Sequence, residues 1–234
     1  MKPPHVTYKY DLERDIDDIE IGLDTIRNGR QPDNELALLI GQYGENPSRE
    51  DIKKYLKVRW ENNESIKEVV IKQLQEYWDS IEEIYFKHLA DRMQLESYYN
   101  IEELTGYLST RHSSGYKHKE NWFAVSAHKG TLGNSLTAMH EIMHIFFHKQ
   151  WWQFYKDQGV EDKNIWDIKE AVTVLLNLWF KYQIVDIDMG YPEHAQFRKN
   201  IKEWFLETRD FKTTLTKACK YINTHKTESP TWVK

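Results

Sequence analysis

The segment from residue 65 to residue 93 has the strongest periodic pattern in the chain and most constrains its fold. Its apolar residues recur every three or four positions, which is the spacing of one face of an α-helix. Ser65, with Glu68 three residues later, predicts a capping box at its start. We expect a helix of this length to be a main packing element of the domain. The apolar positions are Ile66, Val70, Leu74, Tyr77, Ile81, Ile84 or Tyr85, and Leu89.

The first 62 residues predict a helical segment that packs on the main domain. Apolar spacing indicates helices over residues 11–29, 34–44 and 48–60. Two short helices joined by a turn are also found in helix-turn-helix proteins, but no basic face accompanies them here. We therefore expect these helices to cover the core.

Further helices are predicted on the C-terminal side of the chain. They span about residues 134–153, 163–184, 192–207 and 210–223. Asn134 or Ser135 is expected to cap the first of them. We take residues 63–225 as the main domain and residues 226–234 as a tail.

Two short stretches between the long helix and residue 134 favour β-strands. Residues 105–110 and 121–128 are rich in aromatic and β-branched side chains, and a polar, glycine-containing loop (residues 111–120) joins them. We expect a small antiparallel sheet packed beside the following helix. The predicted fold class is α+β and mainly helical.

The composition narrows the class of protein. The chain has 234 residues, 40% hydrophobic and 14% aromatic, which suffices for a packed core. The net charge of −5 is spread without a basic patch, so we expect no nucleic-acid partner. A lone Cys219 allows no intramolecular disulfide. The start lacks an apolar signal region, and the longest apolar stretch (residues 171–180) is too short to cross a bilayer. We expect a soluble, cytoplasmic protein without membrane contact.

The helix predicted from residue 134 contains the sequence His-Glu-Ile-Met-His at residues 140–144. Residues four apart on a helix lie about 40° apart around its axis, one turn from each other. His140 and His144 can therefore share one zinc ion, while Glu141 projects near the open coordination position. Glu141 could then act as the general base toward a metal-activated water.

A catalytic zinc site needs a third protein ligand. His148 continues the spacing by one turn, but it lies about 80° from His140 around a straight helix, which favours a pocket-lining role. Glu170 opens an apolar helical stretch 26 residues after His144 and could reach the same ion from an antiparallel helix. The simpler interpretation of Glu170 is a solvated glutamate beside Lys169. Spacing alone therefore leaves both His148 and Glu170 open as the third ligand.

The arrangement resembles the gluzincin group of zinc metallopeptidases. In that group H-E-x-x-H lies on one helix and a glutamate on a later one. The sequence "SLTAMHEIMHIFFH" is also similar to a segment of the ImmA/IrrE-type peptidases, and "EAVTVLLN" is similar to their glutamate helix. The similarity covers about residues 100–180. Met143 replaces their usual glycine, and the Met-Pro that often follows their glutamate helix is absent.

The resemblance implies a zincin-like domain with specific site residues. His140, His144 and Glu170 would bind one Zn²⁺, and Glu141 would be the catalytic base. Zincins often place an edge strand before the active helix, where an extended substrate pairs with it. The corresponding residues here are Trp122, Phe123, Ala124 and Val125.

Other residues could complete the site. Tyr182, Tyr191 or His194 could stabilise a developing oxyanion, and Asn177 could orient a ligand from outside the coordination shell. We thus expect a zinc-dependent metallopeptidase that acts on a peptide or protein substrate. The alternatives are a regulatory protein that keeps a zincin scaffold without turnover, and a protease that cleaves a single repressor.

Overall fold

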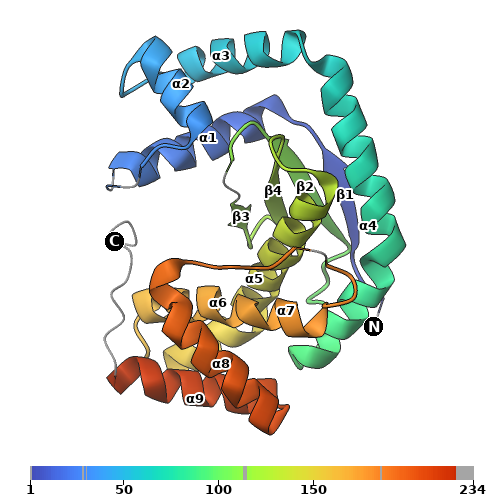
Figure 1. Ribbon diagram of the computed structural model, residues 1–234, viewed down its shortest axis with the longest axis vertical. Coiled ribbons are helices and arrows are strands. Elements are labelled where there is room, and N and C mark those ends of the chain that lie inside the picture. The colour runs from blue at the N-terminus through green and yellow to red at the C-terminus, as the bar shows by residue number, and fades with distance from the viewer. Residues whose placement is uncertain (1, 28, 30, 113–114, 185, 225–234) are drawn as a thin grey trace.

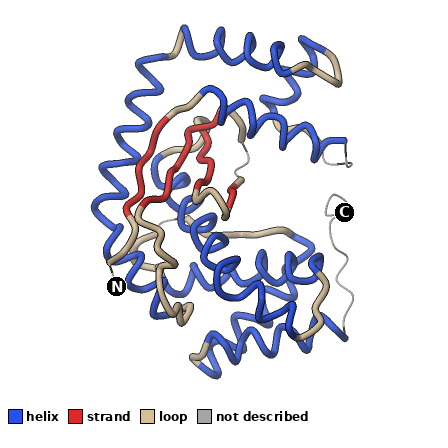
Figure 2. The backbone as a smooth tube through the Cα atoms, turned by 180° about the vertical axis from the view of Figure 1, so that it is seen from behind, coloured by secondary structure: helices blue, strands red, loops and turns tan. Residues whose placement is uncertain are grey.

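The computed structural model describes residues 2–27, 29, 31–112, 115–184 and 186–224. It is mainly helical with a small four-stranded sheet, as expected (Figure 1). The predicted long helix is confirmed as α4 (Glu64–Arg92), which packs along the sheet and against the motif helix. Figure 2 shows the strands together beside α4, with α1 to α3 at one end of the molecule and α6 to α9 at the other.

Most of the other predicted helices form close to their expected bounds, but the one expected over residues 163–184 is divided into three shorter helical segments and ends at Trp179. Before α4 lie α1 (Leu12–Arg27), α2 (Asn34–Tyr43) and α3 (Arg49–Glu61). After the sheet come α5 (Thr131–Asp157), α6 (Asp162–Val172), a 3₁₀ turn (Thr173–Leu175), α7 (Leu176–Trp179), a second 3₁₀ turn (Pro192–His194), α8 (Ala195–Thr208) and α9 (Phe211–Thr224). The tail at residues 226–234 lies outside the described residues.

The predicted helix caps were wrong. The N-cap of α4 is Asn63, without a side-chain cap bond, and the capping box forms instead at α3, between Ser48 and Asp51. The N-cap of α5 is Gly130, so the helix starts several residues earlier than expected. The Asn134 amide instead bonds the backbone N–H and C=O of Ser126 at 2.9 and 2.8 Å. It therefore ties the first turn of α5 to the end of the preceding strand.

The sheet is mixed, so the expected antiparallel arrangement was wrong. Its strands are β1 (His5–Lys9), β2 (Glu103–Ser109), β3 (Tyr116–Lys117) and β4 (Trp122–Ser126), in the order β1-β2-β4-β3. β2 runs parallel to both β1 and β4, and only β3 is antiparallel to its neighbour. The loop predicted at residues 111–120 contains β3, so the chain reverses twice and returns to the direction of β2.

Strand β1 was missed within the N-terminal segment predicted to be helical. It places Val6 and Tyr8 in the core against α4. Gly106 of β2 is required beside it, because a Cβ there would lie 2.6 Å from the Tyr8 ring. The alternation in "HVTYK" was the available signal, but five residues are too few to identify a strand securely.

The helices enclose two groups of buried apolar side chains. The larger group joins the sheet to α4–α9, and all the main-domain helices contribute to it. The smaller one lies among α1, α2 and α3. Within the described residues no helix is long and apolar enough to span a membrane. The smaller group consists of Ile16, Ile19, Leu23, Leu36, Leu39, Ile52 and Leu56.

Candidate metal centre

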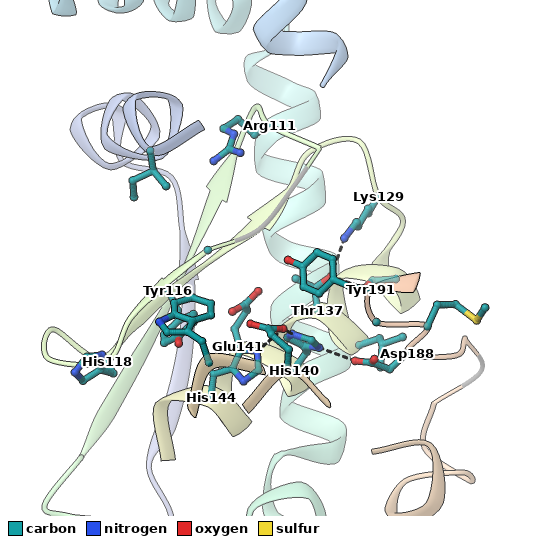
Figure 3. A pocket seen from close by; sticks show the side chains of 18 of the residues that line it. Arg111, Tyr116, His118, Lys129, Thr137, His140, Glu141, His144, Asp188 and Tyr191 are labelled. Atoms are coloured by element: carbon teal, nitrogen blue, oxygen red, sulfur yellow. Dashed lines mark hydrogen bonds and ion pairs between the residues drawn. The ribbon is translucent and has the colours of Figure 1, made fainter. Parts of the chain in front are cut away.

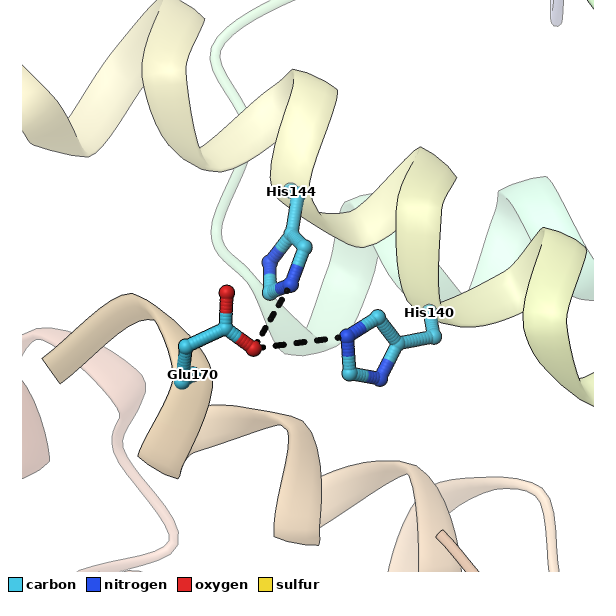
Figure 4. A group of neighbouring side chains, drawn as sticks. All are labelled: His140, His144 and Glu170. Carbon is cyan, nitrogen blue, oxygen red and sulfur yellow. Dashed lines mark ion pairs between the residues drawn. The ribbon is translucent and has the colours of Figure 1, made fainter. Parts of the chain in front are cut away.

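The two motif histidines lie one turn apart on α5, as the four-residue spacing predicts, and the packing of the helices turns them toward α6. Glu170 on α6 points between them (Figure 4). Glu170 Oε2 lies 3.6 Å from His140 Nε2 and 3.3 Å from His144 Nε2. Each of the three residues offers a donor atom, and these atoms all lie within 4.8 Å of one another.

These separations fit a metal ion. Ligands about 2.0–2.1 Å from a tetrahedral zinc lie roughly 3.3–3.5 Å from each other. The two measured nitrogen–oxygen distances of 3.3 and 3.6 Å agree with that spacing. Among the residues that the structure describes, His140, His144 and Glu170 are the one group with such geometry.

The His144 imidazole is buried without a hydrogen bond. Its relative exposure is 1%, and neither ring nitrogen has a hydrogen-bond partner within the described part of the chain. Burial and the nearby Lys169 charge lower the pKa of His144 to about 3, so the ring is neutral at physiological pH. A neutral imidazole with an unused buried nitrogen is the state that a metal ligand requires.

His140 is oriented by Asp188, a residue that the sequence did not single out. His140 Nδ1 donates to Asp188 Oδ2 at 2.6 Å, which directs Nε2 toward Glu170. Burial opposes protonation, but the Asp188 carboxylate raises the pKa of His140 to about 10. A carboxylate behind a ligating histidine is a common means of fixing the ring and raising its basicity.

The loop that carries Asp188 is itself anchored at several points. Arg198 on α8 donates to the Asp188 carboxylate and to its carbonyl, both at 2.6 Å. Asn177, expected to orient a ligand, bonds the Asp188 backbone N–H and C=O at 2.9 Å each. Asn177 therefore contacts the loop that holds His140, rather than a ligand directly. The repeated aspartates in "DIDMG" were the only signal for this loop.

Glu141 is buried beside the histidines and lines the same cleft (Figure 3). Its relative exposure is 4%, so its side chain is largely shielded from bulk water. Lys129, just before α5, bonds Thr137 Oγ1 at 3.0 Å on the same side of the helix. Burial lowers the pKa of Lys129, and the Glu141 charge opposes that shift. Glu141 therefore places a carboxylate inside the cleft, next to the candidate ligands.

The cleft has a volume of about 1320 Å³. It extends from α1 past the motif on α5 to α6 and to the loop before the second 3₁₀ turn, and β3 borders it. Aromatic side chains line the part near α6, and exposed apolar side chains line the loop. The aromatic and apolar residues that line the cleft in this way are Tyr116, Trp152, Trp166, Ile187, Met189 and Tyr191.

His148 lines the cleft and does not belong to the three-residue group. Its Nε2 lies 2.8 Å from the Tyr116 hydroxyl. Its ring stacks between His118 and Trp152, with ring centroids 4.1 and 4.3 Å away. Burial and the neighbouring His118 lower the pKa of His148 to about 2. These contacts place it beside the ligands, as the helical geometry indicates.

The three residues considered for oxyanion stabilisation are placed very differently. Tyr191 lines the cleft. Tyr182 is 84% exposed and does not line it, and buried His194 bonds Asp167 at 3.2 Å, also away from the lining. Tyr116, which the sequence analysis passed over as part of a loop, has its ring 5.3 Å from that of His144. It becomes a candidate because β3 carries it to the cleft.

The expected edge-strand role of Trp122, Phe123, Ala124 and Val125 was wrong. These residues are buried in β4, which lies between β2 and β3. The edge strand on this side of the sheet is β3, and the Ala124 N–H donates to Gly115 O at 2.7 Å. The resemblance to zincins implied that the strand before the motif helix was an edge strand, whereas β3 adds on the outer side of β4.

The chain was compared with protein-family models, curated proteins and solved structures, and none of the three comparisons found a match.

Proposed function

We propose that the protein is a zinc-dependent hydrolase that cleaves peptide bonds, with His140, His144 and Glu170 as metal ligands and Glu141 as general base. The observation that carries the proposal is the convergence of the three donor atoms at distances suited to a tetrahedral ion. The same residues carry the resemblance to gluzincins and, over a shorter stretch, to ImmA/IrrE-type peptidases.

The ligand set fits zinc, although two imidazoles and one carboxylate also suit iron, cobalt or manganese. When bound, the ion would supply Lewis-acid activation of a water and of the substrate carbonyl. Asp188 would hold His140 in the tautomer with Nε2 directed at the ion. Because both histidines, Glu170 and Glu141 lie on two packed helices, the site is held by rigid elements.

Glu141 would accept a proton from the attacking water and donate it to the leaving amine. Tyr116 is suited to stabilise the oxyanion, because burial and the Glu170 charge raise the pKa of its hydroxyl well above 10 and keep it protonated. When His148 Nε2–H donates to the Tyr116 oxygen, the hydroxyl hydrogen is free to point into the cleft.

The size of the cleft supports a polymeric substrate. Pockets for small molecules typically measure about 300–1,000 Å³. The cleft of about 1320 Å³ is larger, and it extends well beyond the ligand group in both directions. An extended peptide segment would fill such a space.

The test combines metal content with turnover. Wild-type protein should contain one zinc per chain by elemental analysis and cleave members of a broad peptide library detected by mass spectrometry. Glu141→Gln should keep the zinc and lower kcat/KM by about 10²–10⁴-fold. Glu83→Gln, an exposed glutamate on α4, is the matched control and should behave like the wild type.

Two results would contradict the proposal. Undiminished cleavage by zinc-loaded Glu141→Gln would exclude the assigned base. Stoichiometric zinc without cleavage of any library peptide would instead favour a zincin-scaffold binding protein.

A further inference from the structure

Lys169 is the one lysine with no exposed surface among the residues that the structure describes. Enclosing an ammonium group costs several kcal/mol unless good partners surround it. Lys169 has three such partners. Its Nζ lies 2.6 Å from Glu170 Oε1, 3.6 Å from the centroid of the Trp166 ring and 4.8 Å from that of Tyr116.

Helix geometry alone does not bring Lys169 to Glu170. Successive residues of a helix point about 100° apart, and adjacent side chains do not face each other. The lysine side chain turns back over Trp166, one turn earlier on α6, and Tyr116 of β3 covers it from another element. Side chains from two elements therefore enclose the Lys169 ammonium where it meets Glu170.

The two oxygens of the Glu170 carboxylate have different partners. Oε1 accepts from Lys169. Oε2 faces the nitrogens of His140 and His144 at 3.6 and 3.3 Å. A carboxylate that bound an ion through both oxygens would have to share Oε1 with the lysine, which repels a cation.

We propose that Lys169 is a positioning residue that makes Glu170 offer only Oε2 to the metal ion. This inference rests on the proposed metal centre. A ligand held in this way keeps the protein's contribution to three donor atoms and leaves coordination positions open for water and substrate. The ion pair with Lys169 also offsets part of the carboxylate charge that the ion would meet.

The experiment uses Co²⁺-loaded protein, because four-coordinate Co²⁺ absorbs visible light more strongly than five-coordinate Co²⁺. Lys169→Met keeps the length of the side chain and removes its charge and donors. We expect Glu170 to bind through both oxygens in this variant, which should lower the visible absorption per bound ion by about twofold or more. Lys163→Met, an exposed lysine on the same helix, is the matched control and should keep the wild-type spectrum.

Folded, loaded Lys169→Met with the wild-type spectrum would overturn the inference and leave Lys169 as a core residue only. Should the variant fail to fold, the wild type decides the matter by infrared difference spectra with and without Zn²⁺, assigned through Glu170→Gln. A wide separation of the two carboxylate stretches supports one-oxygen binding, and a narrow one overturns it. Wild-type protein that binds neither ion in equilibrium dialysis contradicts the metal centre itself, before any lysine variant is made.

Discussion

Two regions of the molecule bury charged or titratable side chains, and they differ in how those side chains are satisfied. Between α1 and β2, Asp15 accepts from the Thr110 backbone at 2.9 Å and from Trp60 Nε1 at 3.3 Å. Asp18 accepts from Ser109 Oγ at 2.6 Å and pairs with a buried Arg111 at 3.2 Å. Both carboxylates thus have donors from other elements.

The region between α5 and α6 is different. His144 is as deeply buried as Asp15, yet its nitrogens make no hydrogen bond within the described residues. Glu170 Oε2 lies near both imidazoles at 3.3 and 3.6 Å, which is longer than a good hydrogen bond. The network around Asp15 and Asp18 pairs both carboxylates and stabilises the fold, whereas a buried imidazole without a hydrogen bond indicates a place for a ligand.

The largest expected effect is the loss of metal in His144→Leu. The substitution removes one of two imidazole ligands, so we expect no stoichiometric zinc. Zinc at about 1,000 times its Kd should stabilise the wild type by about 4 kcal/mol, and this gain should vanish in the variant. Thermal unfolding with and without zinc measures it. His148→Leu, one turn along α5, is the control and should keep the zinc. Loss of zinc in both variants would show that His148 is also a ligand.

A substitution in the network around Asp15 and Asp18 should have the opposite effect, lowering the stability without changing the zinc content. Asp18→Ala leaves the buried Arg111 without its nearest carboxylate, which should cost about 3 kcal/mol of unfolding free energy in urea denaturation. The zinc content of the folded protein should not change. Asp24→Ala, which affects an exposed pair with Arg27 on the same helix, should cost less than about 1 kcal/mol. A loss of zinc in Asp18→Ala would show that the two regions are coupled.

Asp188→Asn tests whether the metal centre is supported from behind. The amide removes the charge that raises the basicity of His140, so zinc affinity should fall by about 10–100-fold in competition with a chelator. Asp186→Asn, two residues earlier and exposed, is the matched control. Equal affinities of Asp188→Asn and the wild type would mean that Asp188 serves only to anchor its loop to Arg198.

The smallest expected effect is a pH dependence of the unfolding free energy, which arises from Asp15. Burial raises the pKa of Asp15 to about 6, although bonds from Thr110 and Trp60 oppose the shift. In the unfolded chain an aspartate titrates near pH 3.9, so at pH 5 Asp15 is protonated in the folded state but not in the unfolded state. As the pH rises to 7 the folded state loses this proton, and the stability that it gives is lost. The stability of the wild type should therefore fall relative to Asp15→Asn by roughly 1 kcal/mol as the pH rises from 5 to 7. Urea titrations at both pH values measure this difference, and a constant difference would contradict it.

Most helices could be predicted because their apolar faces repeat over ten or more residues. The long helix α4 and both helices at the C-terminus formed close to their predicted bounds. The caps and the strands could not be predicted equally well. A cap depends on one or two hydrogen bonds, and a strand of two residues such as β3 has no repeat to detect.

The same distinction applies to the candidate site. The sequence by itself determined that His140 and His144 lie one turn apart with Glu141 between them, because local backbone bonds fix the geometry of a helix. Only the tertiary structure decided what faces them. The packing of α6 on α5 brings Glu170 to the histidines, and a distant loop supplies Asp188. These contacts join residues 26 or more positions apart, so they arise from how the helices and loops pack rather than from any local pattern.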